Sequence, residues 1–134
     1  MTPKRYPAWL RRRRRGAPDP RIMEQLATAM SAADERVIRE VLRADVVLII
    51  DSGGFVPAVS TPQHGRAAVA AGLIALMAPE ETSVAPTSIN GASGFVLSRD
   101  EVVVAAVTAE LRAGLLSSIW VVCNPEKLRQ WNRD

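Results

Sequence analysis

An unbroken run of aliphatic residues, Val46 to Ile50, ends on the carboxylate of Asp51, and Ser52-Gly53-Gly54 follows it. Such a run is typical of a buried strand, and two adjacent glycines are typical of a turn. Because a carboxylate is costly to bury within an apolar strand, Asp51 is expected at the strand's end. There it either faces solvent as a structural residue or lines the mouth of a cavity, and both interpretations stay open at this point.

Two helices are predicted before this strand and one after it. Asp19-Pro20 has the pattern of an N-cap followed by proline at the first helical position, and this helix is expected to run to about Ala32. Asp34 is expected to cap a second, short helix. Residues Arg66 to Met77 repeat apolar side chains around much of a helical surface, which predicts a well-buried third helix that Pro79 ends.

The rest of the chain is read as strands, turns and one terminal helix. A short strand is expected at 55–59, either at an edge or bulged because Pro57 interrupts pairing, and a loop is expected at 61–65. Asn124-Pro125-Glu126 repeats the cap-then-proline pattern of a helix start. Further strands are predicted at 82–90, 94–97, 102–109 and 116–122. Their adjacency favours hairpins, so we expect an α+β fold with N-terminal helices packed on a curved antiparallel sheet.

The charges are distributed unevenly along the 134 residues, although the formal net charge is only +3. Residues 1–18 combine prolines with the basic block Arg11, Arg12, Arg13, Arg14 and Arg15, a composition that cannot bury apolar area. We therefore expect a disordered basic tail or linker at 1–18 and one domain at 19–134. Consecutive guanidinium groups favour phosphates, so the arginine block is a candidate for contact with nucleic acid or another anion, with a flexible linker as the alternative.

Several classes of protein are disfavoured by composition. The single cysteine, Cys123, excludes an internal disulfide and fits a reducing compartment. The longest nearly apolar run is far shorter than the ~20 residues that span a bilayer, so we expect a cytoplasmic protein without a membrane partner. One histidine and one cysteine argue against a metal site, and no cofactor is expected.

Three motifs in order resemble the SnoaL-like branch of the nuclear transport factor 2 superfamily. They are most similar to the C-terminal domain of extracytoplasmic function sigma factors. Asp51-Ser52-Gly53-Gly54 resembles an Asp-Gly-Gly-Gly turn, with Ser52 in place of the first glycine. Ile89-Asn90-Gly91-Ala92-Ser93-Gly94 resembles Val-Asn-Gly-x-Pro-Gly, with Ser93 in place of proline. Asn124-Pro125-Glu126-Lys127-Leu128 resembles the family's Asn-Pro-Asp/Glu-Lys-Leu terminus.

The resemblance implies a cone-shaped, cystatin-like fold with a pocket. Enzymes of the superfamily, among them isomerases, cyclases and epoxide hydrolases, use an acid inside the cone as general base, and Asp51 falls near that position. Such a base needs a partner that stabilises developing charge, yet the one tyrosine lies in the tail and the strand at 102–109 holds no second acid. Residues expected to line the pocket are Asp51, Phe55, Met77, Thr108 and Trp120.

The favoured interpretation is therefore a non-catalytic regulatory or ligand-binding module connected with transcription. Its expected partners are a small apolar ligand, a sigma factor or RNA polymerase, and a second copy of the chain in a homodimer. The alternative is a small isomerase, cyclase or epoxide hydrolase that uses Asp51 as general base. The promoter-reading segments of the sigma factors have no counterpart in this sequence, so sigma activity itself is not expected.

Overall fold

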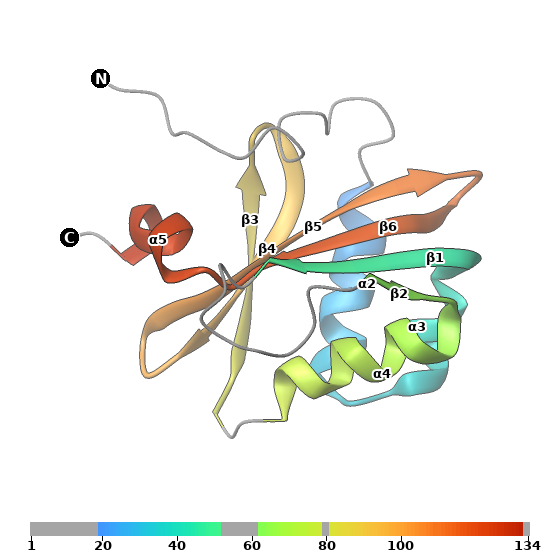
Figure 1. Cartoon of the computed structure of the whole chain (residues 1–134), viewed down its shortest axis with the longest axis horizontal. Coiled ribbons are helices and arrows are strands. Elements are labelled where there is room, and N and C mark those ends of the chain that lie inside the picture. Colours follow the sequence, from blue (N-terminus) through green and yellow to red (C-terminus); the bar gives the residue numbers. More distant parts are fainter. Residues whose placement is uncertain (1–18, 52–61, 79–80, 133–134) are drawn as a thin grey trace.

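A strongly curved sheet carries helices on one side and a short helix at one end in the computed structural model (Figure 1), which describes residues 19–51, 62–78 and 81–132. The helices are α2 (Pro20–Ser31), α3 (Glu35–Glu40), α4 (Arg66–Met77) and α5 (Pro125–Leu128), followed by the 3-10 turn η1 (Arg129–Asn132). The strands are β1 (Leu42–Asp51), β2 (Gln63–His64), β3 (Ser83–Ile89), β4 (Ala92–Arg99), β5 (Val102–Arg112) and β6 (Leu115–Val122).

Side-chain caps fix the starts of three helices. The carboxylate of Asp19 accepts a hydrogen bond from the Arg21 amide at 2.8 Å, and Pro20 occupies the first helical position. Asp34 caps α3 through the Val37 amide at 3.2 Å. Asn124 caps α5 in the same way. Each cap satisfies an amide that the first helical turn leaves without a partner, and these predicted helix starts are confirmed.

The strands are arranged in the order β2-β1-β6-β5-β4-β3. β3 to β6 form an antiparallel meander, as expected. β1 instead lies parallel to β6, with Asp51 beside Val122, and this makes the sheet mixed. Parallel neighbours need a long crossover between them, and here the crossover is the whole stretch of chain from β2 to β5.

Two-residue turns connect the strands of the meander. Asn90 and Gly91 join β3 to β4 with φ of 52° and 80°, and Ala113 and Gly114 join β5 to β6 with φ of 54° and 84°. Positive φ at both central residues is what a type I′ hairpin turn requires, and Asn-Gly is its preferred pair. The motif Asn90-Gly91 is therefore explained by turn geometry.

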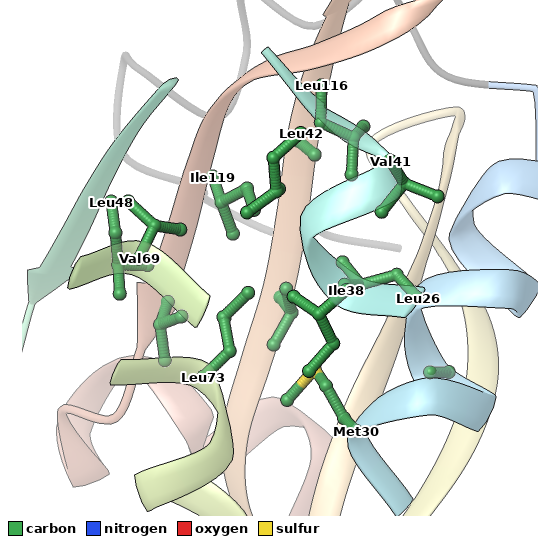
Figure 2. Close-up of a cluster of buried hydrophobic side chains, with 14 of the residues drawn as sticks. Leu26, Met30, Ile38, Val41, Leu42, Leu48, Val69, Leu73, Leu116 and Ile119 are labelled. Carbon is green, nitrogen blue, oxygen red and sulfur yellow. The ribbon is translucent and has the colours of Figure 1, made fainter. Parts of the chain in front are cut away.

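The face of the sheet that carries α2, α3 and α4 is here called the inner face, and it is filled by aliphatic side chains (Figure 2). Helix residues such as Leu26, Ile38 and Leu73 meet strand residues such as Leu48 and Ile119, all at most 1% exposed. Burying a side chain of this size contributes about 1.5–3 kcal/mol. The interior of the predicted cone is thus largely core.

The opposite face of the sheet, here called the outer face, has a smaller apolar cluster under α5 and η1. Leu128 is 2% exposed and packs with Val96, Ala106 and Val122. Both faces of the central strands are therefore covered. This explains why β5 is an almost continuous apolar run without the alternation of a half-exposed strand.

Two expectations need correction, and two more lie outside the described residues. The segment expected as a loop at 61–65 contains β2, which pairs with β1 through His64 opposite Val47. α4 buries one face, through Val69, Ala70 and Leu73, and leaves its other alanines exposed. The short strand expected at 55–59 and the stop at Pro79 lie outside the described residues.

The turn between β5 and β6 offers a test of the hairpin assignment. Ala113 has a positive φ, a conformation that costs alanine about 1 kcal/mol. Asparagine adopts this conformation more readily. Ala113→Asn is expected to raise the free energy of unfolding by roughly 0.5–1 kcal/mol in urea titration. Ala85→Asn, on the exposed part of β3, is the control that should give no gain, and a loss of stability in Ala113→Asn would contradict the turn.

Candidate functional site

A groove of about 430 Å³ lies between α2 and the β3–β4 hairpin, at the edge of the sheet on its inner face. Its volume is within the range of small-molecule sites. Apolar side chains form most of its surface. They are Pro20, Met23, Ala27, Val84, Pro86 and Phe95.

Polar groups are distributed around this apolar surface. α2 contributes Thr28 and Ser31, and the hairpin contributes Thr87, Ser88 and Ser93. None of these five hydroxyls takes part in a side-chain hydrogen bond between described residues. Thr87 alternates with Pro86 and Ser88 and shares the outer side of β3 with Ile89, so the other four hydroxyls are the ones that can donate to or accept from a ligand. Glu24 of α2 is the one ionisable side chain among the described residues that line the groove. A hydrophobic surface with a few polar groups is typical of a small-molecule site.

Asp51 ends β1, as the sequence predicted, but on the outer face. Its register partner in the parallel pair is Val122, which belongs to the outer cluster under α5. The Asp51 carboxylate accepts a hydrogen bond from the ammonium of Lys127 on α5, and their side chains are 22% and 37% exposed. Asp51 therefore acts as an anchor for the C-terminal segment and does not line the groove.

Two further contacts hold the C-terminal segment against β5 beside this ion pair. The carboxamide of Asn132 accepts from the Val103 amide at 2.7 Å and donates to the Val103 carbonyl at 3.0 Å. The side chain thus takes the place of a neighbouring strand, since β6 ends at Val122 opposite Ala106. Together with the buried Leu128, these contacts give the terminal motif a structural role: it holds the C-terminal segment against the sheet.

Thr108 and Trp120 are cross-strand partners on β5 and β6, and Trp120 also lies beside Ile49 of β1. Their positions in the strands alternate with those of the inner-face residues Val107 and Val121, which places both on the outer face with Asp51. Thr108 is 1% exposed, and its hydroxyl has no hydrogen-bond partner among the described residues. The structure thus brings three predicted pocket residues to one face, and the groove lies on the other.

The other predicted site residues lie in the core or outside the described residues. Met77 ends α4 half-buried against the inner core, away from the groove lining. Phe55 and the arginines at 11–15 lie outside the described residues, so their roles as pocket residue and anion contacts stay predictions.

Cys123 lies next to the Asp51 anchor, and its amide donates to the Asp51 carbonyl at 2.8 Å. Burial raises the pKa of the Cys123 thiol, and the negative charge of Asp51 raises it further. The thiol is half-buried against the inner core. A raised pKa leaves less thiolate, which makes this cysteine a poor nucleophile.

Within residues 19–51, 62–78 and 81–132, no three His, Cys, Asp or Glu side chains gather in a way that could hold a metal ion. None of the helices described combines the length and apolar character needed to cross a bilayer.

Sequence reasoning missed the groove because its walls come from segments about sixty residues apart. One signal was present in the chain. Glu24, Thr28 and Ser31 recur at helical spacing beside the apolar series Pro20, Met23 and Ala27, so α2 has a polar line next to an apolar line. That pattern by itself is common to surface helices, and only the position of β3 turns it into a groove.

Comparisons with known proteins identify the fold. The extracytoplasmic function sigma factor SigJ of Mycobacterium tuberculosis matches with a TM-score of 0.62 and 21% identity, over 81% of this chain and 43% of the sigma factor. A protein assigned as a ketosteroid isomerase from Kribbella flavida matches at 0.57 and 15%, over 77% and 75% of the two chains. A Silicibacter pomeroyi protein with a cystatin-like fold matches at 0.57 and 21%, over 81% and 80%.

These likenesses show that the chain has the nuclear transport factor 2-like, or SnoaL-like, fold. It spans less than half the length of the sigma factor. No protein-family model matches the sequence, and no curated protein matches it either.

A substitution of Thr108 tests whether its hydroxyl is buried without a hydrogen-bond partner, away from the groove. An unpaired buried hydroxyl costs about 1–3 kcal/mol, and valine has nearly the same shape without the polar atom. Thr108→Val is expected to raise the free energy of unfolding by about 1 kcal/mol while leaving ligand binding unchanged. Thr87→Val, at a half-buried position of β3, is the matched control, with little expected change in stability. A destabilised Thr108→Val protein would show that the hydroxyl has a partner.

Proposed function

We propose that this chain is a non-catalytic ligand-binding module with a regulatory role, and that the groove between α2 and β3–β4 is its binding site. The observation that carries the proposal is the separation of the two candidate sites. The apolar groove lies on the inner face, and the acid that the superfamily's enzymes would use lies on the outer face. The groove can bind a small apolar molecule without an acid–base pair to transform it.

The composition of the groove supports binding. Met23, Ala27 and Phe95 are each at most 9% exposed, so the floor is formed by side chains that the core already holds in place. A preformed apolar floor saves the ligand the cost of ordering the site. The hydroxyls at the walls can fix its orientation.

The enzymatic alternative lacks support from the geometry of Asp51. A general base must reach the proton it removes, and a carboxylate with a raised pKa needs an apolar surrounding. Asp51 instead pairs with the ammonium of Lys127 at the end of the sheet. Within the groove, Glu24 has no second ionisable group among the described lining residues to complete a catalytic pair.

The regulatory part of the proposal draws on the resemblance to sigma-factor C-terminal domains. The three sequence motifs and the structural likeness to SigJ point the same way. A domain that binds a ligand and contacts a sigma factor or RNA polymerase could report the ligand to transcription. In this role the chain would need a partner and no catalytic group.

Blocking the groove is expected to abolish ligand binding. Ser88 is exposed on the groove side of β3, so Ser88→Trp places a large ring across the mouth without disturbing the core. With 1-naphthylmethanol as probe, we expect the dissociation constant measured by NMR titration to rise at least about tenfold.

The matched control is Ala85→Trp, which adds the same ring to β3 at an exposed position outside the groove lining. It should bind the probe as the original chain does. If both variants bind the probe equally well, or if the original chain does not bind it, the groove is not the site.

The regulatory role is expected to show as complex formation. The purified chain, mixed with purified RNA polymerase core and an extracytoplasmic function sigma factor from the same organism, should elute together with one of them in size-exclusion chromatography. Lysozyme of similar size is the negative control. Elution of the chain alone in both mixtures would contradict the regulatory role and leave the ligand-binding role standing.

A further inference from the structure

Among the described residues that line the groove, Glu24 is the one that carries a negative charge. It lies on α2 with Thr28 and Ser31 at successive helical turns, and all three are exposed at the mouth of the groove. The deeper apolar line of α2, Met23 and Ala27, forms the floor beneath them. A ligand whose body fills the floor would therefore place its end group near the Glu24 carboxylate.

No cation in the described lining neutralises this carboxylate. The other described lining residues are apolar or carry hydroxyls, and the ion pairs between described residues leave Glu24 out. Arg21 lies one turn earlier on α2, yet the two side chains form no ion pair within 4 Å. Exposed pairs at this spacing are weak, so a ligand cation can compete with Arg21.

We propose that the groove selects cationic amphiphiles, that is, small molecules with an apolar body and a protonated amine at one end. This inference rests on the proposed function and names the chemical class of its ligand. The apolar floor supplies affinity for the body irrespective of charge, and Glu24 supplies the preference. Carboxylate attraction favours an ammonium over a hydroxyl, and repulsion disfavours an anion.

The size of the preference follows from the exposure of Glu24. Exposed ion pairs contribute little because water and salt screen them. We therefore expect an amine to bind up to about fivefold more tightly than a neutral molecule of the same shape, and an anion more weakly than either. The preference should decrease as the salt concentration rises.

Three probes share a naphthyl body and differ in the charge of the end group: 1-naphthylmethylamine, 1-naphthylmethanol and 1-naphthoate. Comparing them distinguishes the affinity for the apolar body from the effect of the charge. Their dissociation constants are measured by NMR titration at pH 7 and low salt. The original chain is expected to bind the amine best and the carboxylate worst. Glu24→Gln should bring the amine to the affinity of the alcohol, and Glu24→Lys should make the carboxylate the best ligand.

Glu40→Lys is the matched control, because Glu40 is an exposed glutamate on α3 outside the groove lining. It makes the same change in net charge and should keep the preference for the amine. If the three probes bind equally and Glu24→Lys changes nothing, the cation preference is wrong while the groove remains a binding site. If none of the probes binds, the proposed function fails together with it.

Discussion

The parallel pairing of β1 with β6 determines the faces on which both strands present their side chains. In a parallel pair, register neighbours share a face, so Asp51 follows Val122 to the outer face and Leu48 follows Ile119 to the inner face. A register shift by one residue would exchange these sets and bury the Asp51 carboxylate against the helices. The cost of burying an unpaired charge makes the observed register the stable one.

This register also explains the contact between two of the sequence motifs, the one that begins at Asp51 and the one that contains Lys127. Asp51 and Lys127 belong to motifs 76 residues apart in sequence, and the ion pair joins them. Leu128 closes the outer cluster beside that pair. The family-like residues at these positions are thus explained by anchoring of the C-terminal segment, whereas the groove is built from residues outside both of these motifs.

The sequence predicted the elements that depend on local chemistry. Caps at Asp19, Asp34 and Asn124, with the prolines that follow two of them, locate helix starts because each signal acts within one turn. It missed β2, since Gln63 and His64 become a strand only by pairing with β1. It also could not assign a face to Thr108: β5 is apolar on both faces, so no alternation distinguishes inner from outer.

The position of the groove follows from how the inner face is filled. Leu48 and Ile119 of the sheet and Leu73 of α4 fill the centre of the inner face, and the groove remains where α2 meets the edge hairpin. The central claim is that ligands bind there and not beside Asp51. Intermolecular nuclear Overhauser effects from bound 1-naphthylmethylamine test this directly. We expect them to reach the methyl groups of Met23, Ala27 and Val84, and effects to Trp120 or Ile49 instead would contradict the account.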